Sequence, residues 1–319
     1  MYDVILRPLR RAHAVLRPDC GSFGRNWRMF SNRQYSSHLI SDALLAESPK
    51  MIARIGSTEM QAMTTYMAVT NPARFRSVVG YITNRTPPWW WSTRTFSQLR
   101  DWSGFFPARR DEVERFCELM ISSLSAVDIL GSWLKEEAFF ADQLRNAKRV
   151  MLEDLEPFFC ERPWTLALKG KRVIVVHPFS ATIKSQYQKR RLLFESELLP
   201  EFELECIPAV QSLGGAANGH VDWFGALEHL KNELERATFD VCILGCGAYG
   251  FPLAAHVKRL GKHAVHLGGV TQLLFGIRGR RWDNFLVYPY MNLYNDSWVR
   301  AAPSETPANA ASVEDGCYW

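Results

Sequence analysis

Residues 239–266 read Phe-Asp-Val-Cys-Ile-Leu-Gly-Cys-Gly-Ala-Tyr-Gly-Phe-Pro-Leu-Ala-Ala-His-Val-Lys-Arg-Leu-Gly-Lys-His-Ala-Val-His. A short apolar run of strand length leads into a glycine-rich turn, a helix and a second short strand, which together predict one βαβ unit. Pro252 suits the first turn of that helix, and Gly261 suits its end. Because glycine lets the backbone approach a ligand and the N–H groups of a helix start favour phosphate, the turn is a candidate ligand site.

Strands and helices alternate through most of the remaining chain. Residues 51–55 predict a strand that ends at Gly56 and leads into a helix over residues 60–69, and residues 171–176 give the clearest strand pattern. Further strands are predicted at 127–131 and 203–207, and further helices at 111–123, 136–146, 154–161, after His177 as far as Phe194, and after an N-cap at Asp222. This alternation predicts an α/β fold with a Rossmann-like, mainly parallel sheet and helices on both faces.

The composition changes along the chain and predicts three parts. Residues 1–45 form a basic lead-in, expected to be partly helical and partly irregular. Residues 46–300 are expected to form a single α/β domain, interrupted at about 70–110 by an insertion or lid rich in proline and tryptophan. Residues 211–219 predict a flexible loop, and residues 301–319 form a Pro/Ala/Ser tail.

Composition and charge narrow the classes of function. The formal net charge of +5 over 319 residues is too small for a nucleic-acid footprint. Seven scattered cysteines without a C-x-x-C pair argue against a disulfide scaffold and a cysteine zinc site. Neither a transmembrane run nor a signal peptide is recognised, so a cytoplasmic location is expected. Arg7, Arg10 and Arg11 leave a peripheral contact with the inner membrane face open, although a solvated basic tail is the simpler interpretation.

The glycine turn also matches the dinucleotide fingerprint G-x-G-x-x-G, at Gly245, Gly247 and Gly250. That fingerprint requires an acid at the end of the next strand to bind a ribose hydroxyl, and this chain has His266-Leu-Gly-Gly there. An NAD(P)-linked oxidoreductase is therefore a weaker hypothesis, although Lys262 or Arg278 could bind the 2′-phosphate of NADP. A tight turn with close helix packing is the simplest alternative.

Several short motifs, in order, resemble those of one family. Residues 245–262, 266–272 and 275–282 look like bacterial proteins encoded among surface-polysaccharide genes, and with Ala53-Arg-Ile-Gly-Ser-Thr-Glu59 they resemble GT-D-fold glycosyltransferases over about residues 50–300. The resemblance implies a strand ending in Arg-x-Gly, an Asp-x-Glu motif for the nucleotide-sugar and its divalent metal, and a late βαβ unit. Here Asp-x-Glu reads Ser57-Thr58-Glu59, so one carboxylate is missing and a Mn²⁺ or Mg²⁺ site is weakened.

The resemblance implies transfer of a sugar from a nucleotide-diphosphate donor, a UDP-sugar being favoured, to a surface-glycan or lipid-linked acceptor. Glu59 would be the functional acid, as metal ligand or as base, and His177, directly after the clearest strand, is a second catalytic candidate. The candidates for binding the donor and its phosphates are Arg54, Gly56, Ser57, Gly245, Gly247, Tyr249, Gly268, Gly269, Gln272, Arg278, Arg280 and Arg281.

The acceptor could meet aromatic and polar residues outside these motifs. Trp89 begins a tryptophan triplet, and Asp222 and Trp223 follow a glycine-rich loop. The triplet could also form a membrane-facing patch, and the packing of a lid is the preferred interpretation for it; an N-cap and a core position explain Asp222 and Trp223 equally well. A non-catalytic nucleotide- or glycan-binding member of the fold is a further alternative, because an enzyme that has lost its activity would also lack such an aspartate.

Overall fold

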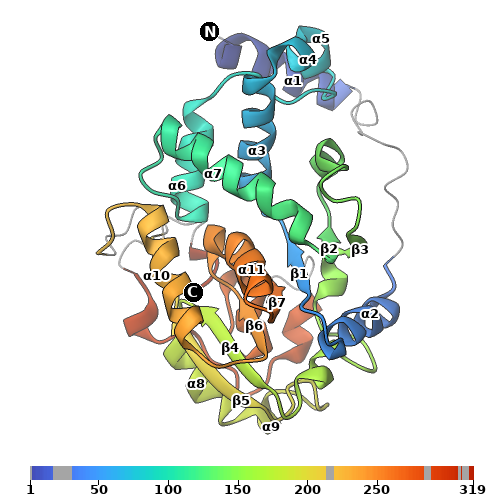
Figure 1. Ribbon diagram of the computed structural model, residues 1–319, viewed down its shortest axis with the longest axis vertical. Coiled ribbons are helices and arrows are strands. Elements are labelled where there is room, and N and C mark those ends of the chain that lie inside the picture. The colour runs from blue at the N-terminus through green and yellow to red at the C-terminus, as the bar shows by residue number, and fades with distance from the viewer. Residues whose placement is uncertain (1, 17–30, 213–218, 284–288, 308–309, 311–315) are drawn as a thin grey trace.

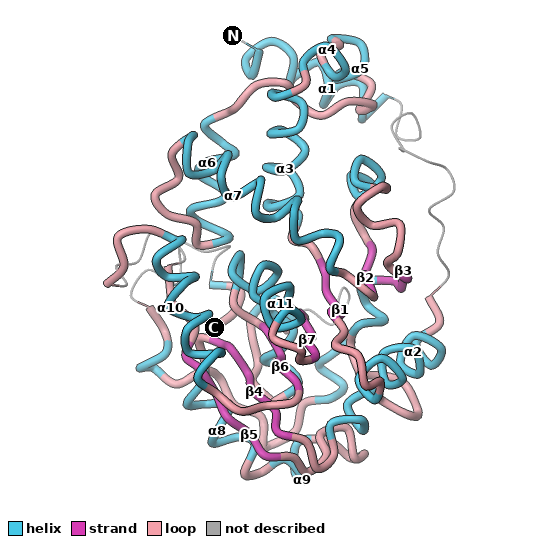
Figure 2. The backbone as a smooth tube through the Cα atoms, in the orientation of Figure 1, coloured by secondary structure: helices cyan, strands magenta, loops and turns pink. Residues whose placement is uncertain are grey.

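The computed structural model describes residues 2–16, 31–212, 219–283, 289–307, 310 and 316–319. Within them, the chain builds a seven-stranded sheet in which every pairing is parallel, in the order β3-β2-β1-β7-β6-β4-β5. The strands are β1 (Met51–Arg54), β2 (Ile129–Ser132), β3 (Lys148–Met151), β4 (Arg172–His177), β5 (Glu203–Pro208), β6 (Val241–Leu244) and β7 (His263–His266). The predicted Rossmann-like parallel α/β fold is confirmed (Figures 1 and 2).

Helices pack on both faces of this sheet, and a few lie beyond it. The described helices are α1 (Tyr2–Leu16), α2 (Arg33–Leu45), α3 (Ser57–Thr70), α4 (Pro72–Phe75), α5 (Val78–Ile82), α6 (Thr93–Ser103), α7 (Arg110–Ser123), α8 (Ser180–Tyr187), α9 (Arg190–Leu193), α10 (Trp223–Arg236), α11 (Gly250–Arg259) and α12 (Thr271–Leu274). Short 3₁₀ turns are Leu124–Ala126, Lys135–Phe140, Leu152–Leu155, Trp164–Leu168, Gly247–Tyr249, Gly268–Val270, Arg280–Trp282, Pro289–Leu293 and Pro303–Glu305.

Alternate strand residues supply two separate apolar cores. Ala53 of β1 belongs to the core beneath α3, α7, α10 and α11, whereas its neighbour Ile52 belongs to the core beneath α2 and α8. Val173 and Ile174 of β4 divide in the same way. Because successive strand side chains point to opposite faces, a strand covered on both sides must be apolar throughout, as β4 is.

The strand order brings the first and last thirds of the sequence together. From β1 the chain runs outward through β2 to β3 at one edge of the sheet. It then crosses to β4 and to β5 at the other edge, and runs inward through β6 to β7. Strand β7 then pairs with β1, with Ala53 opposite His266. The carboxyl ends of β1 and β7 are therefore neighbours, and the motifs that follow them share one edge of the sheet.

Some predicted elements differ in the structure. Residues 136–146 and 154–161, predicted as helices, form short 3₁₀ turns and irregular turns instead, and β3 lies between them unpredicted. In β3 only Val150 is buried, so the sequence lacks both apolar alternation and a continuous apolar run. Residues 213–218 of the predicted flexible loop lie outside the described residues.

The first helix of the predicted lead-in and two short helices of the predicted insertion form one end of the molecule. Helix α2 of the lead-in packs on the sheet instead, and α6 of the insertion packs against α3. Helix α1 of the lead-in packs against α5 of the insertion, and Figure 1 shows α1, α4 and α5 together beyond the far end of α3. A small apolar cluster joins them: Leu6, Ala68, Phe75, Tyr81 and Trp89. Among the described helices, none is long and apolar enough to cross a membrane.

Candidate functional site

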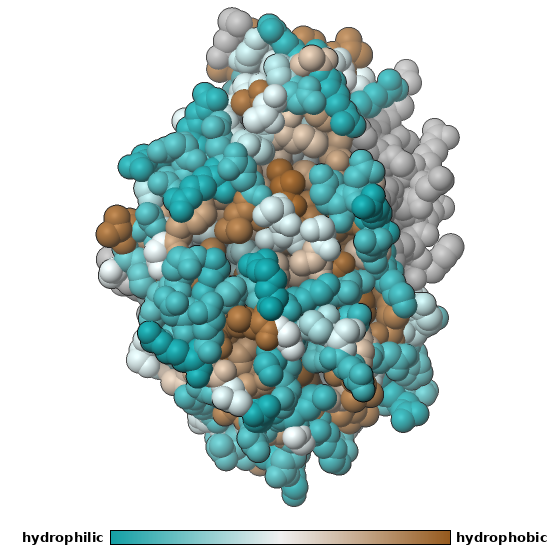
Figure 3. Space-filling model, in the orientation of Figure 1, coloured by the Kyte–Doolittle hydropathy of each residue, from teal (hydrophilic) through white to brown (hydrophobic). Residues whose placement is uncertain are grey.

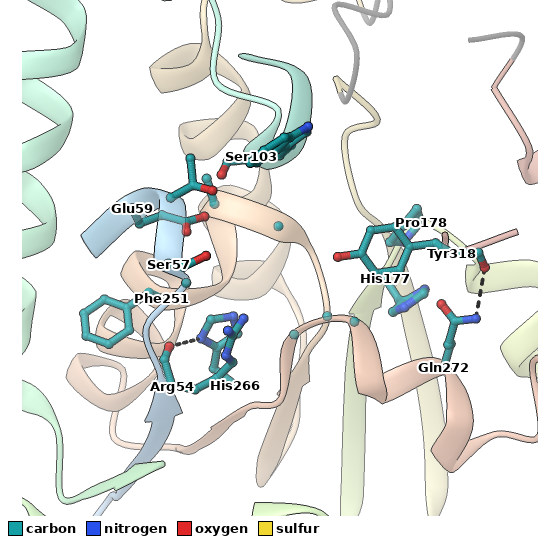
Figure 4. A pocket seen from close by; sticks show the side chains of 18 of the residues that line it. Arg54, Ser57, Glu59, Ser103, His177, Pro178, Phe251, His266, Gln272 and Tyr318 are labelled. Carbon is teal, nitrogen blue, oxygen red and sulfur yellow. Dashed lines mark hydrogen bonds between the residues drawn. The ribbon is translucent and has the colours of Figure 1, made fainter. Parts of the chain in front are cut away.

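A cavity of about 370 Å³ opens at the carboxyl ends of β1, β2, β4, β6 and β7. This edge is where open parallel sheets bind ligands. The cavity is lined by Arg54, Gly56, Ser57, Thr58, Glu59, Trp102, Ser103, Met120, Trp133, His177, Pro178, Phe179, Gly245, Gly247, Ala248, Phe251, His266, Gly268, Gly269, Gln272, Arg281, Tyr318 and Trp319. Figure 4 shows Glu59, Ser57, Arg54 and His266 on one side of it and His177, Tyr318 and Gln272 on the other.

The turn after β1 places one acid over a helix start. Gly56 is the N-cap of α3, and Glu59 lies in the first turn of that helix with 9% of its surface exposed. A Cβ atom at residue 56 would overlap the Glu59 carboxylate, so this position requires glycine for the acid to fold back over the turn. Within the described residues no side chain caps the start of α3, so its first N–H groups and the Glu59 carboxylate border the same cavity.

Arg54, the last residue of β1, is a half-buried cation with spare hydrogen-bonding capacity. Its guanidinium carbon lies 5.3 Å from the centre of the Trp133 ring, and its Nε atom has no hydrogen-bond partner among the described residues. Burial lowers the pKa of Arg54, while the nearby Glu59 carboxylate acts in the opposite direction. A half-buried, incompletely paired guanidinium at a cavity wall is suited to bind an anion.

Two buried histidines border the cavity in neutral form. The Nδ1 atom of His266 lies 3.0 Å from the carbonyl oxygen of Arg54, and burial, aided by the Arg54 charge, lowers its pKa to about 3. The Nδ1 atom of His177 accepts the backbone N–H of Phe179 at 3.0 Å, and burial lowers its pKa to about 3. Groups of such low pKa are poor bases at neutral pH, so these contacts favour structural roles.

The glycines of the turn after β6 accommodate neighbouring side chains. A Cβ at Gly245 would lie 2.6 Å from His177 Cδ2 and 2.7 Å from Thr271 Cβ, and a Cβ at Gly250 would overlap the His266 ring. Gly247 has a φ of 57°, in the left-handed region. The turn is therefore packed closely against the protein, which supports an architectural role for these glycines.

The C-terminal residues form a wall of the cavity, although the sequence indicated only a tail. Gln272 Nε2 donates to the carbonyl oxygen of Tyr318 at 3.0 Å, and Arg281 Nη1 donates to the Tyr318 hydroxyl at 3.2 Å. Gly269 leaves room for the Tyr318 ring, which a Cβ there would overlap. Arg281 thus reaches the cavity stacked on Tyr318, with 4.8 Å between its guanidinium carbon and the ring centre.

Most of the residues predicted for the site line this cavity. They are Arg54, Gly56, Ser57, Glu59, His177, Gly245, Gly247, Gly268, Gly269, Gln272 and Arg281. The lining does not include Tyr249, Arg278, Arg280, Trp89, Asp222 or Trp223.

Core packing accounts for the aromatic residues among those outside. Trp223 is fully buried and stacks on Tyr249, with 5.0 Å between ring centres and 7° between planes. Trp89 is buried in the cluster beneath α1. The prediction that Trp89 and Trp223 contact an acceptor is therefore corrected to core roles in this structure, because large apolar rings gain most from full burial.

Local contacts account for the polar residues outside the cavity. The Asp222 side chain accepts the backbone N–H of Gly225 and caps α10. Arg278 lies over the Tyr294 ring at 4.8 Å and pairs with Asp283 at 3.7 Å. Arg280 is exposed in a 3₁₀ turn next to Arg281. Neighbouring arginines of one basic run therefore differ in whether they reach the cavity.

Several lining residues were not predicted. Trp133 directly follows β2, so the rule that ligand contacts follow strand ends could have found it. Trp102 and Ser103 end α6, and Tyr318 and Trp319 come from the last residues of the chain. No local pattern marks these four residues, because long-range packing alone brings them to the strand ends.

The donor set offers limited support for a divalent cation. Glu59 is the one carboxylate among the described lining residues, with the hydroxyls of Ser57 and Thr58 beside it. No cluster of three or more His, Cys, Asp or Glu side chains suited to a metal occurs within the described part of the chain. Mg²⁺ in nucleotide sites is held by one or two carboxylates together with phosphates, so Glu59 could supply one ligand and the substrate the others.

Comparison of the chain with protein-family models, with curated proteins and with solved structures finds no match.

Proposed function

We propose that this protein is a glycosyltransferase that moves a sugar from a nucleotide-diphosphate donor to a surface-glycan acceptor. The observation that carries the proposal is the convergence of two distant segments on one cavity. Arg54 ends β1 and Gly56 and Glu59 follow it, and the glycines at 245, 247, 268 and 269 follow β6 and β7. These are the segments whose motifs resemble the GT-D family.

Two arginines and a helix start would hold the donor diphosphate. Arg54 and Arg281 are the arginines that line the described cavity. The N-terminus of α3, a helix of 14 residues, presents free N–H groups beside them. Charge-assisted hydrogen bonds from guanidinium groups to phosphate oxygens are strong and directional, so this arrangement suits a diphosphate.

Aromatic walls would hold the rest of the donor. Trp102 and Trp133 stand at the rim with 39% and 42% of their surfaces exposed, and Tyr318 and Trp319 line the wall provided by the C-terminus. Exposed rings beside a cavity can stack on a nucleobase or on the apolar face of a sugar. The cavity thus offers both a cationic region and planar surfaces.

Glu59 is the group proposed to move the proton. An acceptor hydroxyl that gives its proton to Glu59 would attack the anomeric carbon while the bond from that carbon to the diphosphate oxygen breaks. The arginines would stabilise the negative charge that develops on the departing diphosphate. A metal bound by the diphosphate would add to this stabilisation, and Glu59 could then be a ligand instead.

A dinucleotide-linked oxidoreductase has less support. In the dinucleotide fold an acid at the end of the strand after the glycine turn binds a ribose hydroxyl. His266 occupies that place at the end of β7, where it is buried, neutral and bound to the Arg54 carbonyl. Neither this residue nor Gly268 and Gly269 after it supplies the carboxylate.

The donor is identified by thermal shift with UDP-, GDP-, CMP- and dTDP-sugars and NADP(H), each with and without Mn²⁺. We expect stabilisation by at least one nucleotide-sugar, with the effect lost in Arg54→Ala and Arg281→Ala. Arg280→Ala is the matched control, because it removes the neighbouring exposed arginine outside the cavity. Absence of a shift with every nucleotide-sugar would reject the proposal, and a shift with NADP(H) alone would favour the oxidoreductase.

A further inference from the structure

Helix α1 turns its apolar side toward solvent. Five apolar side chains on it are largely exposed: Val4 78%, Ile5 54%, Leu9 48%, Val15 80% and Leu16 78%. At about 100° per residue these positions, together with Pro8 and Ala12, fall within an arc of about 140° on one side of the helix. Leu6, on another side, is the buried residue of α1 and belongs to the cluster with Phe75, Tyr81 and Trp89.

Helix α5 adds two exposed apolar side chains at the same end of the molecule. Val78 and Val79 are 49% and 68% exposed, and α5 packs against α1. Figure 1 places α1, α4 and α5 at one end of the molecule, away from the sheet, and Figure 3 shows hydrophobic residues beside hydrophilic ones at that end. We call this surface, formed by residues 2–16 and 71–94, the basic apolar end.

The basic apolar end also carries the positive charge of the molecule. It contains seven arginines, Arg7, Arg10, Arg11, Arg74, Arg76, Arg85 and Arg94, and a single acid, Asp3. Its formal net charge is therefore +6, whereas the whole chain carries +5, so the remaining residues are slightly negative. Arg11, Arg74, Arg76, Arg85 and Arg94 are exposed.

We propose that the basic apolar end docks on an anionic phospholipid bilayer. An exposed apolar arc bordered by arginines is the pattern of helices that lie in a membrane interface, with the apolar side inserted and the cations at the phosphates. A second copy of this chain fits the same surface poorly, because two such ends would bring charges of the same sign together. Charge complementarity therefore selects the lipid surface as the occupant.

A further cavity lies between the basic apolar end and the candidate site. It has a volume of about 490 Å³ and lies between α1 and the start of α3, and Arg7, Arg10, Arg11 and Arg94 are among its lining residues. Ser57 lines both this cavity and the candidate site. If the proposed transferase function holds, the arginine-lined cavity suits the phosphate of a lipid-linked acceptor; the docking itself does not depend on that function.

The docking is tested by co-sedimentation of the full chain, without donor, with vesicles of phosphatidylcholine alone and of phosphatidylcholine mixed equally with phosphatidylglycerol. We expect binding to the anionic vesicles and little to the neutral ones. The triple variant Ile5→Ser, Leu9→Ser, Leu16→Ser should lose affinity by about tenfold or more, because three inserted side chains are removed. The control variant Leu45→Ser, Leu192→Ser changes residues that are 62% and 63% exposed elsewhere, and it should bind as wild type.

A second variant tests the charge. Arg74→Glu, Arg76→Glu, Arg85→Glu should weaken binding by about a hundredfold or more, because each arginine near an anionic surface contributes substantially. The control is a triple variant that makes the same charge change at exposed positions elsewhere: Arg145→Glu, Arg162→Glu, Arg191→Glu. Its fold-loss of vesicle affinity should be less than a tenth of that of the first variant. Melting temperatures of all variants confirm folding, which exposed substitutions should preserve.

Two results would overturn the docking. One is equal binding of wild-type protein to neutral and anionic vesicles, or to neither. The other combines two findings: wild-type protein is a dimer that binds no vesicles, and the apolar triple variant is a monomer. That result would make a second copy of the chain the occupant of this surface. Donor affinity measured in parallel should be the same in wild type and variants, so failure of docking is distinguishable from failure of the proposed function.

Discussion

Glu59 combines burial, a helix start and a place on the cavity wall. Glu59→Gln keeps the shape of the side chain but removes its ability to accept a proton or to hold a cation strongly. We expect the rate of sugar transfer to fall by about 100- to 10,000-fold, with donor binding largely retained. Product formation is measured by chromatography, with Glu228→Gln on the exposed face of α10 as control.

Full activity of Glu59→Gln would contradict the proposed proton transfer. The opposite result, no product from wild type while nucleotide-sugars still bind, would favour the non-catalytic alternative.

The two buried histidines predict how stability responds to acid. His177 and His266 have pKa values lowered from 6.5 to about 3 by burial, so between these values the unfolded chain binds more protons than the folded one. Their stabilising contribution is present above about pH 6.5 and is lost as the pH falls toward 3. We expect the free energy of unfolding, measured with urea, to fall between pH 7 and pH 4.5.

His266→Gln tests this assignment, because glutamine does not titrate. The variant should be less stable at pH 7 but should show a shallower decrease with acid. A decrease as steep as that of wild type would show that other groups dominate.

At the scale of elements, two glycines at helix starts differ in what surrounds them. Gly250 begins α11 against the His266 ring, whereas Gly225 in the first turn of α10 is exposed and would place a Cβ 3.4 Å from Asp222 Oδ1. Gly250→Ala should lower the free energy of unfolding by about 1–3 kcal/mol through overpacking. Gly225→Ala should raise it by up to about 1 kcal/mol, because alanine favours the helix.

Chemical denaturation of both variants provides the measurement. Equal effects of the two substitutions would show that the His266 contact does not explain the glycine at 250.

Predicted elements succeeded where periodicity was strong and failed where it was weak. Strand β4 has four consecutive buried apolar residues from Val173 to Val176, and its pattern alone identified it. Residues 135–140 contain apolar and charged residues at helical spacing, yet they form a 3₁₀ turn held by Glu137, whose Oε1 accepts the backbone N–H groups of Trp133 and Leu134. A side chain that satisfies backbone donors competes with the α-helical hydrogen bonds.

At the scale of the molecule, the candidate site needs the end of the chain. Tyr318 fills the space above Gly269 and connects Gln272 with Arg281. Tyr318→Ala should weaken nucleotide-sugar binding by about tenfold, because an aromatic wall and the partner that orients Arg281 are both removed. Calorimetric titration measures the affinity.

Tyr35→Ala is the matched control, since Tyr35 is 62% exposed on α2 and lies outside the cavity. Unchanged affinity in Tyr318→Ala would exclude the C-terminal residues from the binding surface.

The sequence by itself determined the α/β class, the parallel sheet and two of the segments that meet at the site. These depend on local periodicity and on glycines at strand ends, which are properties of neighbouring residues. The strand end at Gly56 and the turn at 245–250 could therefore be located from the sequence, whereas Arg54 and Glu59 were singled out by the resemblance of their motif to that of GT-D glycosyltransferases. The sequence also showed arginines among leucines in residues 1–16, without showing which side of that helix is covered.

Only the tertiary structure decided which residues share the cavity. It brought β7 beside β1 and placed Trp223 in the core and Tyr318 at the site. It placed Arg281 in the cavity lining and its neighbour Arg280 outside it. It also buried Leu6 and left the apolar arc of α1 exposed. These outcomes depend on contacts between residues far apart in sequence, and the sum of such contacts, rather than any local pattern, sets which side chains are buried.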